Sequence, residues 1–211
     1  MEREVLIPAG AARLPGTLIA PDGARGVVVF AHGSGSSRLS PRNREVAAVL
    51  RGSGILGTLL FDLLTPDEDR VYATRFDIGL LVERLLAATR WLLSEPEFAE
   101  TPVGFFGAST GAAAALGAAA ELPGPVRAVV SRGGRPDLAG DALPRVVAPT
   151  LLIVGGLDTE VIGLNEMALR RLGSHEKQIE IVPGATHLFE EPGTLEVVSR
   201  LTAAWFERYL G

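Results

Sequence analysis

Short apolar runs alternate with longer segments of helical periodicity along nearly the whole chain. A continuous β-branched run such as residues 26–31 (GVVVFA) is typical of a strand buried on both faces of a parallel sheet. Strands of this kind are predicted at residues 26–31, 55–63, 103–106, 126–131, 150–154 and 178–182. Two earlier runs, residues 5–7 and 16–20, flank a turn that contains Gly and Pro, and they predict an antiparallel start.

The segments between the strands repeat apolar residues at helical spacing. In residues 75–93 the apolar side chains recur at i, i+3, i+4 and i+7, which places them on one face of a helix. Helices are predicted at residues 41–51, 75–93, 110–121, 160–172 and 195–209. The alternation favours a doubly wound α/β fold with a mostly parallel sheet. Because fewer than twenty residues join the strands ending near Ser131 and starting at Thr150, we expect no separate cap domain.

Composition narrows the class of protein. A chain of 211 residues suits one domain, expected over residues 1–211, and 47% hydrophobic residues exclude disorder as its overall state. The absence of cysteine excludes a disulfide scaffold, a thiolate metal site and a cysteine nucleophile. A net charge of −5 argues against general nucleic-acid binding, because no basic excess is present to neutralise phosphates.

The sequence carries no targeting signal that we recognise. The start, MEREVLIP, lacks a positive segment followed by a long apolar stretch. No apolar run approaches the roughly 18 residues that a membrane-spanning helix needs. We therefore expect a soluble cytoplasmic protein that has no membrane partner; its oligomeric state, monomer or dimer, stays open.

Residues 107–111 (GASTG) match Gly-x-Ser-x-Gly, the pattern of a nucleophile elbow. A predicted strand leads into the motif and a predicted helix leads out of it, which is the setting that a sharp strand-to-helix turn needs. The flanking glycines let neighbouring segments approach without Cβ clashes, and the helix start places the Thr110 N–H beside developing negative charge. An ordinary Gly-rich strand–helix turn is the alternative to Ser109 as nucleophile.

A serine nucleophile needs a base, and only His32, His175 and His187 are available. His187 follows the last predicted strand, where the base of this arrangement belongs. It is the candidate base, and a surface histidine or local hydrogen-bonder is the alternative.

The orienting acid is expected after the preceding strand. Asp158 ends the run LLIVGGLD at residues 151–158 and completes the chain order Ser, Asp, His. Asp158 could instead cap the helix that follows it, and Asp137 and Asp141 are weaker candidates for the acid.

The oxyanion hole needs a second backbone N–H from the loop that follows the predicted strand at residues 26–31. Residues 32–37 (HGSGSS) occupy that place. The Ser34 N–H is the preferred donor beside Thr110, with Gly33 or Gly35 as alternatives, and His32 is interpreted as a structural hydrogen-bonder. No Lys-Ser/Thr pair follows the loop, which disfavours a phosphate-binding loop.

These segments together resemble the α/β-hydrolase superfamily, and more narrowly its small, capless dienelactone-hydrolase-like branch. The resemblance covers essentially the whole chain and rests on five segments: AHGSGSSR at 31–38, GASTG at 107–111, SRGGRPDL at 131–138, VGGLD at 154–158 and PGATHLF at 183–189. One departure is that dienelactone hydrolases proper use a Cys nucleophile, whereas this chain has Ser109. Related domains also occur fused to phosphoribosyltransferases, a domain that we do not expect within these residues.

The resemblance implies an α/β-hydrolase fold, a Ser109–Asp158–His187 triad and hydrolysis through an acyl-enzyme. The expected substrate is a small carboxylic ester or lactone, and neither a cofactor nor a metal is expected. A non-catalytic α/β-hydrolase-fold domain that serves binding or assembly is the alternative function.

Arginines crowd the same predicted edge of the sheet. Arg38 follows the proposed oxyanion loop and Arg132 follows the strand at residues 126–131, so either could hold an anionic group of the substrate. The alternative for these arginines is solvation at the surface or an ion pair with an acidic residue such as Asp62 or Asp69.

Overall fold

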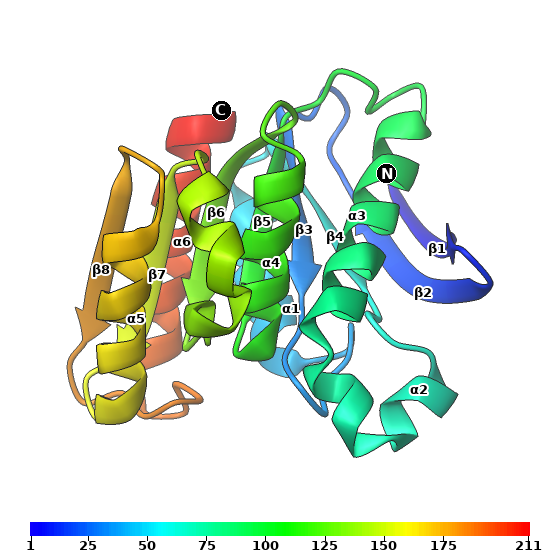
Figure 1. The fold of residues 1–211 in the computed structure, drawn as a ribbon. Helices are drawn as coiled ribbons and strands as arrows, with labels where there is room; N and C mark the ends of the chain where they lie inside the picture. The colour runs from blue at the N-terminus through cyan, green and yellow to red at the C-terminus, as the bar shows by residue number, and fades with distance from the viewer.

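In the computed structural model, which describes all residues Met1–Gly211, the strands form one eight-stranded sheet in the order β1-β2-β4-β3-β5-β6-β7-β8 (Figure 1). The strands are β1 (Glu2–Ala9), β2 (Ala12–Ile19), β3 (Gly26–Ala31), β4 (Leu56–Phe61), β5 (Val103–Ala108), β6 (Val126–Arg132), β7 (Thr150–Gly155) and β8 (Lys177–Val182). β1 pairs antiparallel with β2, and β2 pairs antiparallel with β4. Strands β3 to β8 run parallel, so the doubly wound sheet with an antiparallel start is confirmed.

Helices cover both faces of this sheet. They are α1 (Pro41–Gly52), α2 (Pro66–Arg70), α3 (Ile78–Ser94), α4 (Thr110–Glu121), α5 (Thr159–Arg171), α6 (Thr194–Leu210) and the 3-10 segments η1 (Tyr72–Phe76) and η2 (Pro136–Arg145). In Figure 1, α3, α4 and α5 lie in front of the sheet, whereas α1 and α6 pack together behind it. No separate cap domain lies between β6 and β7, where η2 fills the connection.

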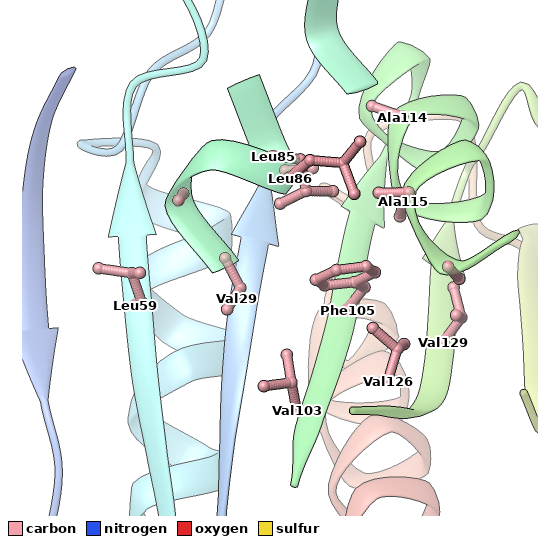
Figure 2. Close-up of a cluster of buried hydrophobic side chains, with 14 of the residues drawn as sticks. Val29, Leu59, Leu85, Leu86, Val103, Phe105, Ala114, Ala115, Val126 and Val129 are labelled. Atoms are coloured by element: carbon pink, nitrogen blue, oxygen red, sulfur yellow. The ribbon is translucent and has the colours of Figure 1, made fainter. Parts of the chain in front are cut away.

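Two apolar clusters hold the layers together. The front cluster joins the sheet to α3 and α4; Figure 2 shows part of it, with Val29, Leu59, Phe105 and Val129 on the strands and Leu85, Leu86, Ala114 and Ala115 on the helices. The rear cluster joins the sheet to α1 and α6 and contains Phe30, Phe106, Phe189 and Phe206. Successive strand residues point to opposite faces, so Val129 belongs to the front cluster and Val130 to the rear cluster.

The structure corrects some predicted boundaries. The helix predicted from residue 75 begins at Ile78, because the Asp77 side chain accepts a hydrogen bond from the Leu80 N–H and caps the helix there. The two N-terminal strands are longer than predicted, since their pairing in a hairpin extends beyond the apolar runs. No helix is both long enough and apolar enough to cross a bilayer.

The parallel arrangement brings the loops after β3, β5, β6, β7 and β8 to one edge of the sheet, the lower edge in Figure 1. Ligands of open α/β sheets bind at this carboxyl edge. All five segments that carry the candidate chemistry therefore converge there.

Candidate active site

Ser109 occupies the turn between β5 and α4, with φ 51° and ψ −122°. Only two non-glycine residues have a positive φ, Ser109 and Phe189. Such a backbone costs about 1–3 kcal/mol, and strained residues of this kind cluster at functional sites. The Ser109 side chain does not cap α4, which leaves its hydroxyl available for other chemistry.

The two glycines of the elbow are required by close backbone approach. A Cβ on Gly107 would lie 2.5 Å from Ala112 Cα, and a Cβ on Gly111 would lie 2.1 Å from the Ala31 carbonyl oxygen. Neither distance is compatible with a side chain, so the sequence pattern reflects how tightly α4 starts against β3 and β5.

Asp158 and His187 meet across two loops. His187 Nδ1 donates to Asp158 Oδ2 at 2.6 Å. Asp158 stands at the N-cap position of α5, yet its side chain makes no capping hydrogen bond. The loops are also joined through the backbone, since the Leu157 N–H donates to the Ala185 carbonyl at 2.9 Å. With its proton on Nδ1, the imidazole presents Nε2 as an acceptor.

The segment after β6 lies between Ser109 and His187. The Ser109 N–H donates to the Arg132 carbonyl at 3.3 Å, and the Arg135 N–H donates to the Ser109 carbonyl at 3.0 Å. A Cβ on Gly133 would lie 2.9 Å from the His187 carbonyl oxygen and 3.6 Å from its Nδ1. No hydrogen bond joins Ser109 Oγ to His187 Nε2; in unliganded sites such bonds are often long and tighten only with substrate.

The loop after β3 packs against the elbow. A Cβ on Gly33 would lie 3.0 Å from Ser109 Cβ, so this loop borders the candidate nucleophile directly. The Ser34 N–H, the preferred second oxyanion donor, points to the Thr110 hydroxyl at 3.0 Å. The Thr110 N–H begins α4 and belongs to the first turn, whose N–H groups lack intrahelical partners.

The other histidines have different positions. His32 is buried, and its Nδ1 donates to the Gly33 carbonyl while its Nε2 accepts from the Leu63 N–H at 3.0 Å. Burial lowers the pKa of His32, which keeps the ring neutral in this arrangement. His32 is therefore the structural hydrogen-bonder expected from the sequence. His175 is exposed just before β8, at the opposite edge of the sheet.

The weaker acid candidates are paired elsewhere. Asp137 accepts two hydrogen bonds from Arg135, and Asp141 pairs with Arg171 at 3.2 Å. Neither pairs with a histidine.

Arg38 and Arg132 differ in their surroundings. Arg38 lies 3.4 Å from Glu4 and 3.7 Å from Asp62, and its side chain is partly exposed. It lines a cavity of about 510 Å³, which lies between α1 and strands β1, β2 and β4. Arg132 is only 7% exposed and makes no ion pair, and its Nε and Nη1 are buried without hydrogen-bond partners.

The electrostatics of Arg132 follow from that burial. Burial, and to a smaller extent the nearby charge of Arg42, lower the pKa of Arg132 to about 10. Arg42 itself pairs with Glu190 at 2.8 Å, in the loop that carries His187. At neutral pH the molecule thus holds a buried cation without a counter-charge at the edge that carries Ser109.

The sequence did not point to the residues that hold the His187 loop. Thr186 donates through its N–H and its hydroxyl to the Glu191 carboxylate, at 3.1 and 2.6 Å. These hydrogen bonds lower the pKa of Glu191. Phe189 buries its ring in the rear cluster. The only sequence signal for this loop was the motif PGATHLF, and a motif does not indicate which of its residues anchor the loop.

No group of three or more His, Cys, Asp or Glu side chains gathers in a way that could hold a metal ion.

Comparison with known proteins identifies the family and the fold. Residues 61–208 match the Dienelactone hydrolase family, and the chain belongs to that family. The crystal structure of a dienelactone hydrolase from Anabaena variabilis superimposes with a TM-score of 0.95 at 56% identity, over 100% of this chain and 99% of that one. An esterase domain from a Rhodothermus marinus protein shares the fold, with a TM-score of 0.79 at 22% identity over 100% of both chains. The capless dienelactone-hydrolase-like fold inferred from the sequence is thereby confirmed, and family and fold support a hydrolase.

Curated relatives carry another name. Two proteins from strains of Mycobacterium tuberculosis, each called a putative phosphoribosyl transferase, are 59% identical over 209 residues. The match covers 99% of this chain but 47% of each relative, so the chain spans about half the length of these relatives.

Proposed function

We propose that this chain is a serine hydrolase that cleaves small carboxylic esters or lactones through an acyl-enzyme on Ser109. The observation that carries the proposal is the 2.6 Å hydrogen bond from His187 to Asp158, at the sheet edge where Ser109 holds its strained turn. Membership of the Dienelactone hydrolase family supports the same class of reaction.

In the first step, Ser109 Oγ attacks the ester carbonyl while His187 Nε2 removes the hydroxyl proton. Asp158 holds the imidazole in the tautomer with its proton on Nδ1 and stabilises the imidazolium that forms. The imidazolium then donates its proton to the leaving alkoxide as the tetrahedral intermediate collapses to the acyl-enzyme. Water, activated by the same histidine, attacks the acyl carbon and releases the acid and free Ser109.

The oxyanion of each tetrahedral intermediate accepts hydrogen bonds from the Thr110 and Ser34 N–H groups. Each such donor contributes on the order of 3 kcal/mol of transition-state stabilisation. Because the Ser34 N–H also faces the Thr110 hydroxyl, we expect it to be shared between that oxygen and the oxyanion. The positive end of α4 adds to this stabilisation.

The charge pattern supports a preference for esters that carry an anionic group. Arg132 is the first candidate to bind that group, because its buried guanidinium lacks a counter-charge. Arg38 is the second candidate, although it stands within 4 Å of Glu4 and Asp62. A bound carboxylate or phosphate at Arg132 would supply the missing partner.

The names of the curated relatives raise a second activity, phosphoribosyl transfer. Those proteins are about twice as long as the matched region, and that region belongs to the Dienelactone hydrolase family. We therefore place ester hydrolysis, and not phosphoribosyl transfer, in this chain. A non-catalytic role in binding or assembly is the other alternative, and an ordered Ser109, Asp158 and His187 set weighs against it.

Turnover of a panel of acetyl, butyryl and aryl esters and of simple lactones by the purified chain tests the proposal. We expect hydrolysis by the native protein, no turnover by Ser109→Ala, and unchanged turnover by Ser94→Ala, which alters a serine at the end of α3. In parallel, the chain is incubated with 5-phosphoribosyl diphosphate and a nucleobase, where no nucleotide product is expected. Absence of ester turnover, or equal turnover by Ser109→Ala, contradicts the proposal.

A further inference from the structure

Phe189 combines two features that rarely occur in one residue. Its backbone has φ 56°, a region that bulky side chains avoid because Cβ approaches the carbonyl oxygen too closely. Its ring is nevertheless only 1% exposed. A fold retains such a residue only where the surrounding contacts outweigh the strain.

The ring fixes the loop from the inside. It belongs to the rear cluster, which joins the sheet to α1 and α6. The same glycine, Gly133, borders both the ring and the histidine: a Cβ there would lie 3.4 Å from Phe189 Cε2 and 2.9 Å from the His187 carbonyl oxygen. Phe189 and His187 therefore pack against one short piece of backbone, the piece that also contacts Ser109.

The left-handed backbone of Phe189 reverses the chain. The Phe189 N–H donates to the Thr186 carbonyl at 3.3 Å and closes a turn around His187. The ring returns to the core, while the His187 side chain stays 38% exposed and reaches Asp158. On the outer side, Thr186 and Glu191 close the same loop. The imidazole itself has one hydrogen bond, so its direction depends on how its backbone is held.

We propose that Phe189 is a positioning residue for the hydrolysis. Its buried ring anchors the loop, and its left-handed backbone sets the direction in which His187 projects, so that Nδ1 stays on Asp158 and Nε2 is directed toward Ser109. This inference rests on the proposed function for its effect on turnover, but the hydrogen bond that it concerns exists without substrate.

The test compares Phe189→Ala and Phe189→Leu with Phe206→Leu. The control removes part of another fully buried ring of the rear cluster. Phe206 packs on Gly104 near the start of β5, where a Cβ would lie 2.5 Å from its Cε1, and this end of the sheet is opposite to the His187 loop. Misplacing a catalytic group by about 1 Å can cost 100-fold, so we expect Phe189→Ala to lower kcat by about 10- to 100-fold with little change in KM. Phe189→Leu keeps part of the anchor and should recover part of kcat. Phe206→Leu should lower Tm while leaving kcat unchanged.

A second readout needs no turnover. A far-downfield proton resonance of His187 Nδ1–H, assigned by its loss in His187→Gln, should be present in the native protein and in Phe206→Leu. It should be broadened or lost in Phe189→Ala. If the native protein shows no esterase activity but Phe189→Ala still loses the resonance, the proposed function fails and the positioning role stands. Native kcat and an intact resonance in both Phe189 variants would overturn the positioning role. So would an equal fall of kcat in Phe206→Leu.

Discussion

The nucleophile elbow and the His187 loop lie at the same edge of the sheet, but they are built in different ways. At the elbow, a Cβ on Gly107 would lie 2.5 Å from Ala112 Cα and a Cβ on Gly111 would lie 2.1 Å from the Ala31 carbonyl oxygen, so two glycines close to Ser109 in the sequence make the turn possible. The His187 loop depends on distant segments: Asp158 after β7, Gly133 after β6 and the rear cluster under Phe189.

The candidate site therefore contains two regions whose geometry has different origins. Ser109, the proposed nucleophile, is positioned by glycines at the turn that holds it, whereas His187, the proposed base, is positioned by packing between distant segments. A change at the elbow should therefore disturb folding and catalysis together. A change to Asp158, whose side chain caps no helix and only contacts His187, should disturb catalysis with a smaller effect on stability.

Asp158→Asn is expected to have the largest effect. The change keeps the shape of the side chain but removes the charge that holds the imidazole tautomer, and a change of this type lowers kcat by on the order of 10⁴-fold in a related triad. Thermal unfolding should shift little, because the side chain caps no helix. The matched control is Asp137→Asn, which alters a carboxylate paired with Arg135. An Asp158→Asn variant with native kcat would contradict the base-orienting role.

Gly111→Ala tests how tightly the backbone is constrained at the elbow. The added methyl would lie 2.1 Å from the Ala31 carbonyl oxygen, so β3 and α4 must move apart. Overpacking of this kind costs about 1–3 kcal/mol, to be measured by denaturant unfolding, and kcat should fall with it. Gly124→Ala is the control, because nothing lies within 4 Å of its added Cβ. Equal stability of the two variants would mean that the elbow is less constrained than its contacts indicate.

Arg132→Met tests whether Arg132 binds an anionic group of the substrate. Loss of a charge-assisted hydrogen bond, about 1.5–3 kcal/mol, should lower kcat/KM for an anionic ester by roughly 10- to 100-fold relative to a neutral ester. Stability should be unchanged or higher, because replacing an unpaired buried charge by an apolar side chain of similar size removes a cost. Arg145→Met, at an exposed pair with Glu121, is the control. An unchanged ratio of the two kcat/KM values would exclude Arg132 as the anion site.

The smallest expected effect concerns His32, the first residue of the candidate oxyanion loop. Burial lowers its pKa in the folded protein, whereas the unfolded chain has the ordinary value of about 6.5. Just below pH 6.5 the unfolded state therefore binds more protons than the folded state. The stability contributed by neutral His32 is fully present above that pH. That contribution is lost as the pH falls, by at most about 1.4 kcal/mol per pH unit.

Measurement of the free energy of unfolding between pH 7 and pH 5 checks this slope. His32→Gln should flatten the dependence relative to the native protein, whereas His175→Gln, which alters an exposed ring, should not. A native slope in His32→Gln would show that another group causes the dependence.

Much of the fold could be predicted from the sequence because buried parallel strands such as residues 26–31 and amphipathic helices have strong periodic patterns. The helix start at Ile78 was missed, since the apolar spacing continues upstream and only the Asp77 cap marks the boundary. The candidate residues Ser109, Asp158 and His187 could be named from motif and chain order. The anchoring role of Phe189 and the burial of Arg132 could not, because both depend on contacts between segments far apart in the sequence.

The proposed hydrolysis requires that Ser109 is an activated nucleophile. Treating the native protein, Ser109→Ala and Ser94→Ala with a fluorophosphonate, followed by intact-mass measurement, tests it most directly. We expect a single covalent adduct on the native protein and on Ser94→Ala, and none on Ser109→Ala. No adduct on the native protein, or an adduct that persists in Ser109→Ala, would contradict it.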